Sequence, residues 1–484
     1  MTITHDIVQK LWNLCNVLKH DGVTYHQYVS ELTYLLFLKM MQEVDKEDQL
    51  PEGYRWDDLA AKNGVEQMDF YRQMLIYLGS HGSSRVQEIY ASAGTIIKKP
   101  KTLQELVTEI GKLDWYSARQ EGLGDLYEGL LQKNAGETKS GAGQYFTPRP
   151  LIKTIVKLMK PQAGELVQDP AAGTGGFLII ADAYIKKQTD DLFDLSESEA
   201  NFQRTKAFYG LEHVQDTHRL SLMNMMLHGI ESGVQYGDTL SPDGANLPKA
   251  DVILTNPPFG SSSAGGLPTR DDFTFSTANK QLAFMQHIYR GLKPGGRAAV
   301  VLPDNVLFED NTGKQIRRDL MDKCDLHTIL RLPTGIFYAQ GVKTNVLFFT
   351  RGKTDKDNTQ NVWVYDMRTN MPKFGKRTPL LESTFAEFVH VYGEDVYGNS
   401  KRKEGDDGQS RWKCFSRDDI IKRGDNLDIT WLKDENASDA EDLEEPDVIA
   451  AQIMNNLRTA LGEMEALSEL LDIDDSYVKA EATE

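Results

Sequence analysis

The sequence predicts an α/β protein, in which an open sheet of alternating strands and helices follows a mostly helical amino-terminal region. From residue 165 onward, short β-branched and aliphatic runs alternate with segments of helical periodicity. Before residue 140, leucines and methionines recur at spacings of three and four, as in amphipathic helices. The flexible segment 139–143 separates the two patterns. We therefore expect two or three domains in the 484 residues.

The composition is ordinary for a soluble globular protein, with 40% hydrophobic and 26% charged residues. No apolar run approaches the roughly 18 residues that span a bilayer, and the first residues lack the basic and apolar regions of a signal peptide. The three cysteines, Cys15, Cys324 and Cys414, match no zinc or disulfide spacing. These observations predict a cytoplasmic protein with no membrane span and no metal.

The formal net charge of −18 restricts how the chain meets nucleic acid. Affinity for nucleic acid comes mainly from phosphate contacts, which need a basic face. A protein that grips DNA along its whole surface is therefore excluded. Three alternatives stay open: the basic residues gather on one face, another chain supplies most of the grip, or the substrate is not nucleic acid.

Residues 251–255 predict a buried strand because they form a β-branched and aliphatic run, and two prolines then end it abruptly. The four residues that follow are Asn256, Pro257, Pro258 and Phe259. In an open α/β sheet, ligands bind at the carboxyl ends of the strands. We therefore expect these four residues to lie at a binding crevice.

These residue types suit transfer to an exocyclic amino group, whose lone pair is delocalised into its ring. The Asn256 side-chain carbonyl and a backbone carbonyl near Pro257 can each accept one amino hydrogen, which draws the nitrogen toward tetrahedral geometry. Proline fixes φ and adds no competing donor, and Phe259 offers a face for stacking. The alternative is a strand-ending turn with a packed phenylalanine.

A glycine-rich turn follows an earlier predicted strand, residues 166–169, and leads into a predicted helix at 178–187. The turn contains Ala171, Gly173, Thr174, Gly175 and Gly176 after the strand-ending Asp169. Its glycines let the backbone turn sharply and approach a ligand closely. The spacing differs from the dinucleotide-binding pattern, and no Lys-Ser/Thr pair follows, which argues against a nucleoside triphosphate.

Two carboxylates stand at the ends of the next predicted strands, 207–211 and 234–236. The carboxylate of Glu212 can accept hydrogen bonds from ribose hydroxyls. It follows Asp169 by more than the gap of about 20 residues that usually separates a glycine turn from such a carboxylate. The carboxylate of Asp238 can accept a hydrogen bond from an adenine amino group. We interpret the polar segment 188–204 as an inserted loop. Taken singly, either acid is as well explained by a solvated loop.

Further elements complete the predicted α/β pattern. We predict helices at 150–159, 217–227 and 280–292, and strands at 298–302, 327–332, 345–350 and 362–365. The aromatic loop before the first of these helices contains Tyr145, Phe146, Thr147 and Pro148 and is either packed or placed against a ligand. Residues 260–266 form either a mobile lid or a plain exposed loop.

The carboxyl-terminal part has two predicted regions. Residues 401–447 are highly charged and poor in aliphatic side chains, which predicts exposed connections. A heptad stripe then follows, formed by Ile453, Leu457, Ala460, Met464, Leu467 and Leu471. A helix with such a stripe packs either on its own chain or on a partner. The basic segment 373–377 contacts phosphate or is a solvated loop.

Three segments together resemble the motifs of amino-group DNA methyltransferases: 144–148, 169–177 and 256–259. Their order along the chain is similar to that of the adenine-N6 class. More narrowly, the chain resembles the modification (M) subunit of type I restriction-modification systems, a likeness that also includes segments 293–297 and 342–349.

The resemblance implies a Rossmann-like S-adenosylmethionine-dependent methyltransferase domain at 141–400, a helical domain at 1–140, a charged connecting region at 401–447 and a partner-binding helix at 448–484. It implies catalysis by residues 256–259, without metal or covalent intermediate. The implied S-adenosyl-L-methionine contacts are Tyr145, Phe146, Thr147, Pro148, Asp169, Ala171, Gly173, Thr174, Gly175, Gly176, Glu212 and Asp238.

The resemblance also implies partners. Two M subunits join one specificity (S) subunit that reads double-stranded DNA, and a motor-nuclease (R) subunit can join them. This arrangement explains the acidic charge, and it gives the terminal heptad a partner. The alternatives are methylation of a protein glutamine or an RNA base, or a scaffold that binds cofactor without turnover.

Overall fold

The computed structural model describes residues 3–19, 25–137, 147–259, 267–337, 342–375, 378–405 and 410–433, together with positions 453, 454, 457, 461 and 464. The chain divides into two compact units. Unit 1 contains Met1–Ala142, Gly173–Gly175 and Val214–Val234. Unit 2 contains Gly143–Ala172, Gly176–His213 and Gln235–Glu484. Among the described residues, no helix combines the length and apolar character that crossing a membrane requires.

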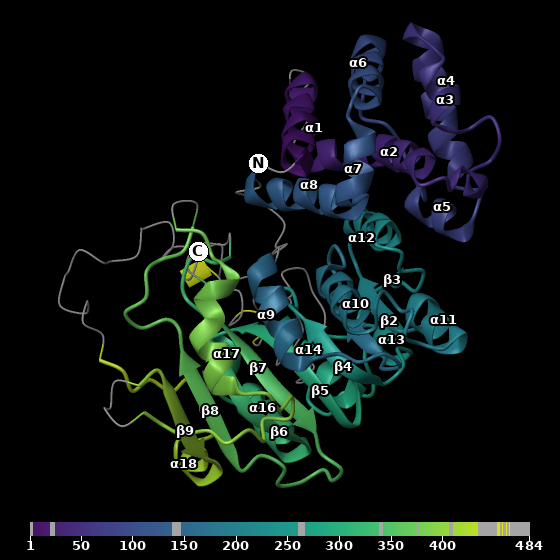
Figure 1. The fold of residues 1–484 in the computed structure, drawn as a ribbon. Helices are drawn as coiled ribbons and strands as arrows, with labels where there is room; N and C mark the ends of the chain where they lie inside the picture. Colours follow the sequence, from purple (N-terminus) through teal and green to yellow (C-terminus); the bar gives the residue numbers. More distant parts are fainter. Residues whose placement is uncertain are drawn as a thin grey trace, which may run out of the picture. The chain divides into compact units, whose positions relative to one another are not determined.

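Unit 1 is helical, as the leucine and methionine spacing predicts (Figure 1). Its helices are α1 (Ile3–Lys19), α2 (Tyr25–Glu43), η1 (Glu47–Gln49), α3 (Trp56–Ala60), α4 (Gly64–Leu78), α5 (Ser84–Ile89), α6 (Pro100–Gly111), α7 (Trp115–Glu121), α8 (Leu123–Glu137) and α12 (Gln215–Leu227). The last of these, α12, comes from the middle of the chain and was predicted at 217–227. Unit 1 therefore combines distant segments of sequence.

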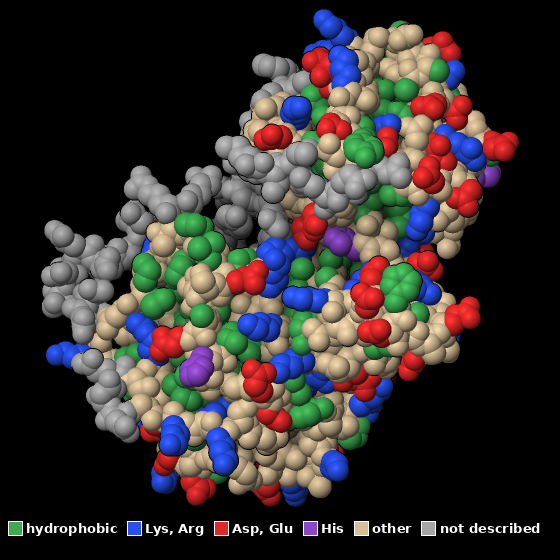
Figure 2. Space-filling view, viewed as in Figure 1, with side chains coloured by type: hydrophobic (Ala, Val, Ile, Leu, Met, Phe, Trp, Pro, Cys, Tyr) green, Lys and Arg blue, Asp and Glu red, His purple; other side chains and the backbone are tan. Residues whose placement is uncertain are grey.

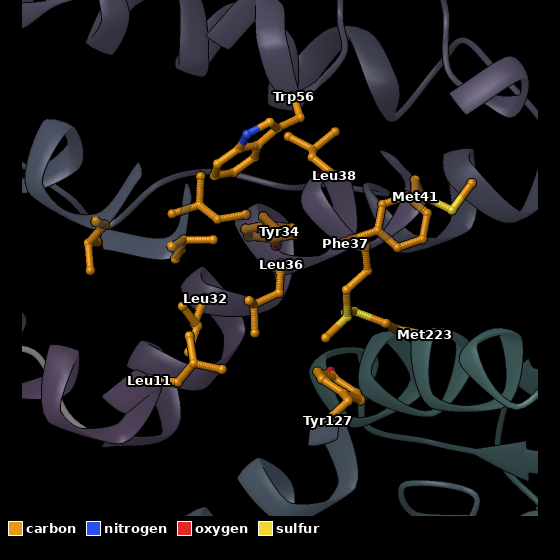
Figure 3. Packing of buried hydrophobic residues seen from close by; sticks show 14 of the residues in the cluster. Leu11, Leu32, Tyr34, Leu36, Phe37, Leu38, Met41, Trp56, Tyr127 and Met223 are labelled. Atoms are coloured by element: carbon orange, nitrogen blue, oxygen red, sulfur yellow. The ribbon is translucent and has the colours of Figure 1, made fainter. Parts of the chain in front are cut away.

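The core of unit 1 surrounds α2. Residues 31–41 of this helix are all buried, so the helix is covered on every side rather than along one stripe. Figure 3 shows Leu36 and Phe37 of α2 among side chains from α1, α3, α8 and α12, including Tyr127 and Met223. Because Tyr127 and Met223 share this core, α8 and α12 are packed into one unit.

Unit 2 is built on a mixed sheet with the order β3-β2-β1-β4-β5-β7-β6-β8-β9. The strands are β1 (Val167–Asp169), β2 (Phe208–Glu212), β3 (Val234–Tyr236), β4 (Ala250–Thr255), β5 (Leu292–Pro303), β6 (Cys324–Arg331), β7 (Thr344–Arg351), β8 (Asn361–Asp366) and β9 (Trp412–Ser416). β1 pairs in parallel with β2 and with β4, and β7 runs antiparallel to β5 and β6. The predicted α/β class is confirmed.

Helices cover both faces of this sheet (Figure 1). They are α9 (Arg149–Met159), α10 (Gly176–Gln188), α11 (Glu197–Thr205), α13 (Pro242–Ala245), α14 (Lys280–Gly291), α15 (Asn305–Phe308), α16 (Thr312–Lys323), η2 (Glu382–Phe385), α17 (Ala386–Tyr392) and α18 (Arg417–Lys422). Phe349 packs in the cluster that includes α14 and α16, whereas Phe348 contacts Phe388 and Tyr392 of α17. Successive strand residues point to opposite faces, which explains this division.

Two segments differ from the sequence prediction. The polar segment 188–204, interpreted as an inserted loop, contains most of α11. Ser196 and Glu199 form a capping box at its start, with the Ser196 hydroxyl accepting from the Glu199 amide. The apolar pattern is weak there because little of the helix is buried, but the Ser-x-x-Glu signature was readable in the sequence.

The prediction of exposed connections at 401–447 is wrong for residues 412–429. β9 extends the sheet beside β8, and Trp412 stacks on Trp363 with ring centroids 5.0 Å apart. Ile420, Leu427 and Ile429 are also buried in unit 2. The apolar residues in this stretch are few and widely spaced among charged residues. The composition of the stretch therefore does not indicate a strand.

Several predictions lie outside the described residues. These are the connector 139–143, the segment 260–266, positions 376 and 377, and Ala460, Leu467 and Leu471 of the heptad. Of the remaining heptad positions, Ile453, Leu457 and Met464 are helical, and each leaves more than half of its surface exposed.

A buried arginine fastens the end of α9 to β5. Arg297 is 3% exposed, and its guanidinium forms a two-pronged pair with Glu165, at 2.7 and 2.9 Å. It also donates to the carbonyls of Met159 and Lys160, where α9 ends. Four hydrogen bonds from one planar group satisfy both the half-buried Glu165 carboxylate and two helix-terminal carbonyls.

We predict that Arg297→Lys destabilises the protein by about 3 kcal/mol, because an ammonium cannot reproduce the fork and leaves buried acceptors without donors. Urea unfolding measures the change. The control is Arg72→Lys at an exposed pair with Asp69, which we expect to stay within about 0.5 kcal/mol. Equal effects of the two substitutions would contradict this role of Arg297.

Candidate functional site

The candidate site lies where the strand order of the sheet reverses. β1 and β4 are parallel neighbours, with Val167 opposite Val252 and Gln168 opposite Ile253. The chain continues from β1 to β2 and β3 on one side, whereas β4 continues to β5 on the other. Such a switch point opens a crevice at the carboxyl ends of the strands, where the connections diverge. Asp169 ends β1 there, and Asn256 follows β4.

Polar side chains stand along this edge in the order of the strands. Asp238 follows β3, Glu212 ends β2, Asp169 ends β1 and Asn256 follows β4. Neighbouring strands are about 4.8 Å apart, so the four positions span roughly 14 Å along the edge. The sequence prediction that these groups follow strand ends is confirmed, and the sheet order makes them neighbours in pairs.

The Asn256 amide has a defined orientation. Its Nδ2 donates a hydrogen bond of 2.9 Å to Oγ1 of Thr147, which lies just before α9. The donor nitrogen and the acceptor oxygen of a side-chain amide point in different directions within the amide plane. With the nitrogen directed at Thr147, the carbonyl oxygen is directed away from it, which suits acceptance of a hydrogen from an amino group. The sequence did not predict this contact.

The residues after Asn256 combine a rigid turn with an aromatic pair. Pro257 is buried and Pro258 exposed, and the Pro258 carbonyl accepts a 3.4 Å hydrogen bond from Nε2 of Gln281. Phe259 is half-buried and meets the ring of Phe337 edge-on, at 6.1 Å and 69°. Sequence reasoning missed Gln281 and Phe337, because neither belongs to a motif.

Asp169 is an unusually placed carboxyl group. It is 1% exposed, and its Oδ1 accepts a 3.1 Å hydrogen bond from the Ala171 amide. Burial raises its pKa to about 7, the hydrogen bond from Ala171 opposes that rise, and the negative charge of Glu212 adds to it. A carboxyl group in this state suits a ligand with positive charge, because such a ligand favours the ionised form.

The glycine turn after β1 requires glycine for two reasons. Gly173 and Gly175 have φ values of +54° and +81°, which side chains rarely adopt. A Cβ at Gly173 would meet no atom within 4 Å, so the backbone there faces open space. A Cβ at Gly176 would lie 2.9 Å from the Arg149 guanidinium, so glycine permits the close packing of α10 on α9.

The same turn is fastened by a buried amide in unit 1. Asn224 of α12 is fully buried, and its Nδ2 donates a 2.9 Å hydrogen bond to the Thr174 carbonyl. Sequence analysis missed Asn224, although a polar residue within the apolar pattern of a helix is a signal of such a role. This hydrogen bond holds the backbone of the turn at Thr174.

The remaining predicted site residues have simpler settings. Glu212 and Asp238 are half-buried, and Oδ1 of Asp238 accepts a 2.9 Å hydrogen bond from the Leu240 amide. Pro148 forms the N-cap of α9. Tyr145 and Phe146 lie outside the described residues. A buried carboxyl group, the half-buried carboxylates of Glu212 and Asp238 and the glycine turn after β1 fit S-adenosylmethionine, which carries an ammonium, a sulfonium and ribose hydroxyls.

Comparisons with known proteins agree with this geometry. The N-6 DNA methylase family matches residues 118–441, and the HsdM N-terminal domain matches residues 7–110. The StySPI methylase subunit of Salmonella potsdam is 55% identical, over 97% of this chain and 96% of that protein. The EcoKI methylase subunit of Escherichia coli K12 is 54% identical over the same shares.

Solved structures give the same result. The EcoKI M protein crystal structure covers 97% of both chains, with 50% identity and a TM-score of 0.58. A modification subunit of a type I restriction enzyme from Vibrio vulnificus covers 92% of this chain and 99% of that one, with 26% identity and a TM-score of 0.70. The chain therefore belongs to the type I restriction enzyme methylase subunits, and it is an S-adenosylmethionine-dependent, adenine-specific N6 DNA methyltransferase subunit.

Proposed function

We propose that the methyl group is transferred to an adenine that is flipped out of DNA and held by residues 256–259. The observation that carries this proposal is the Asn256 amide, whose nitrogen is held by Thr147. Its carbonyl oxygen accepts one hydrogen of the adenine amino group. A backbone carbonyl near Pro257 accepts the other hydrogen, and Phe259 stacks on the base.

The chemistry needs only these groups from the protein. S-adenosylmethionine, when bound, supplies an electrophilic methyl group on a sulfonium. Two carbonyl acceptors draw the adenine nitrogen toward tetrahedral geometry and localise its lone pair for in-line attack. Both acceptors are fixed before the reaction, Asn256 by Thr147 and the turn by its two prolines, so little reorganisation accompanies the step. The transfer forms no covalent intermediate with the protein.

We assign the cofactor to the row of carboxylates and the glycine turn. Asp169 and the backbone of residues 173–176 contact the methionine part, Glu212 the ribose and Asp238 the adenine. The row extends over roughly 14 Å, a length that suits a nucleoside with an amino-acid chain.

The chain acts within a larger assembly in our proposal. Relatives named as type I methylase subunits support partnership with other subunits of a type I restriction enzyme. In this proposal two methylase subunits join one specificity subunit, which reads the DNA sequence, and a motor-nuclease subunit can join them. The net charge of −18 is consistent with a partner subunit that makes most of the contacts to the DNA phosphates. The face drawn in Figure 2 mixes basic and acidic side chains rather than gathering one sign.

The assay for the function is transfer of labelled methyl to DNA by the chain together with its specificity subunit. We predict that Asn256→Ala lowers kcat by about a hundredfold to a thousandfold, the effect of removing one oriented group that acts on the reacting atom. Cofactor affinity stays unchanged because Asn256 does not contact the cofactor in this proposal. The control is Asn201→Ala, an exposed position on α11. Full activity of Asn256→Ala would refute the assignment.

We predict that Thr147→Val lowers kcat by about tenfold to a hundredfold, because the amide of Asn256 loses the acceptor that orients it. Valine keeps the volume and removes the hydroxyl, whereas Thr147→Ser keeps the hydroxyl and restores most of the rate. The KM for S-adenosylmethionine separates two roles. An unchanged KM supports positioning of Asn256, and a raised KM with unchanged kcat supports the cofactor contact that the sequence predicts.

The pKa of Asp169 gives a prediction for pH. In the free chain the carboxyl group titrates at about 7, above its ordinary value of 3.8, so at pH 6 it is mostly protonated. Binding of a cationic cofactor favours the carboxylate and expels the proton, so affinity rises with pH up to about 7 and then levels off. Calorimetry in two buffers of different ionisation enthalpy should detect a release that approaches about one proton per cofactor at pH 6.

The matched control for this measurement is Asp169→Asn, which cannot titrate and should release no proton. The same pKa shift affects stability with the opposite sign. Unfolding lets Asp169 ionise at its ordinary pKa, so its contribution to stability falls as pH rises from about 4 to about 7. Wild type and Asp169→Asn should therefore diverge in stability over that window. Parallel pH profiles would contradict the raised pKa.

A further inference from the structure

Three side chains of metal-binding types meet in unit 1, and none of them is among the residues assigned to methyl transfer. They are Asp125 and Glu128 on α8 and His228 directly after α12. One ligand atom from each lies within 4.8 Å of the other two. Asp125 and Glu128 are three residues apart on one helix, which places them on the same face. His228 joins them although it lies far along the chain.

One ring nitrogen of His228 is held by the backbone of α12. Its Nδ1 lies 2.7 Å from the backbone carbonyl of Asn224, so the Nδ1 hydrogen is donated to that carbonyl. In a neutral imidazole the other nitrogen, Nε2, then carries the lone pair. A ring hydrogen donated to a carbonyl is the usual arrangement around histidines that bind metals, where it fixes the tautomer.

Gly124 admits the imidazole to the surface of α8. A Cβ at this position would lie 2.6 Å from Cε1, 2.7 Å from Nε2 and 2.8 Å from Nδ1 of His228. Real side chains do not approach so closely, so any other residue would displace the ring. Glycine lowers helix propensity, and its presence at 124 is explained by the ring that lies against it.

The three side chains differ in how far they are exposed to solvent. Glu128 of α8 is only 6% exposed. Asp125 is exposed, so the group opens to solvent on one side. A cation can therefore enter from solvent on the side of Asp125 and be bound by the more deeply buried Glu128.

We propose that Asp125, Glu128 and His228 bind one divalent transition-metal cation, of which Zn²⁺ is the representative, with water at the open position. One imidazole and two carboxylates suit such borderline ions better than Ca²⁺ or Mg²⁺, which prefer oxygen ligands alone. Bonds of 2.0–2.2 Å place neighbouring ligand atoms roughly 3.4 Å apart, so side-chain rotations of about 1 Å close the site.

The cation joins α8 to α12, two helices that also share the buried Tyr127 and Met223 (Figure 3). Because the joined helices come from distant parts of the chain, binding stabilises the folded arrangement of unit 1 over the unfolded chain. The role of the cation is structural, since none of its three ligands is among the groups assigned to methyl transfer.

The test uses the full chain freed of metal by chelation and titrated with Zn²⁺, Mn²⁺ or Mg²⁺ by calorimetry and by thermal unfolding. We expect Zn²⁺ to bind one to one with a micromolar or lower Kd and to raise Tm by several degrees, and Mg²⁺ to bind far more weakly. Asp125→Asn, which removes an exposed charge and leaves the fold intact, weakens Zn²⁺ binding at least tenfold.

Two further variants separate ligation from other causes. His228→Gln removes the nitrogen ligand, and Gly124→Ala displaces the ring without removing any ligand; each weakens binding at least tenfold. The control is His390→Gln, an exposed histidine of α17, which leaves affinity unchanged. X-ray absorption of the zinc-loaded chain should show one nitrogen and two carboxylate oxygens. Binding that is absent, or equal in wild type and Asp125→Asn, overturns the proposal.

Discussion

The parallel pairing of β1 with β4 is the constraint on which the rest of unit 2 depends. It sets a point where the strand order reverses, so that the connections diverge there and leave the strand ends open. The buried carboxyl group of Asp169 and the amide of Asn256 thereby become neighbours. The near-continuous apolar run of β4 makes this pairing stable, because a strand in the middle of a sheet covered on both faces is buried on both sides.

The buried charged groups Arg297 and Asp169 differ in how well their surroundings stabilise the charge. Arg297 is surrounded by acceptors that satisfy its guanidinium, so its charge contributes to stability. Asp169 is buried with no comparable cation bonded to it among the described residues, and its pKa of about 7 records an unfavourable environment for the carboxylate. A group kept in this state lowers stability near neutral pH, which is the pattern of a site shaped for a ligand rather than for folding.

The sequence predicted every strand of unit 2 except β9, because buried strands form short continuous apolar runs, and it predicted the helices α9, α10 and α14. It did not predict α13 or the helices from α15 to α18, and it failed for α11 and β9, where the signal was local capping in one case and scattered aromatic residues in the other. The motif residues after β1 and β4 were found because strand, glycine turn and proline are local patterns. Gln281 and Phe337 were missed because they meet the site from other elements and carry no motif.

The sequence by itself determined which chemistry-bearing residues end which strands, since periodicity and turn residues act over a few neighbours. Only the tertiary structure decided which of them meet. Thr147 contacts Asn256 and His228 approaches α8 because strand order and helix packing bring together segments far apart in the chain. Such contacts depend on the geometry of the whole core, and no local pattern encodes that geometry.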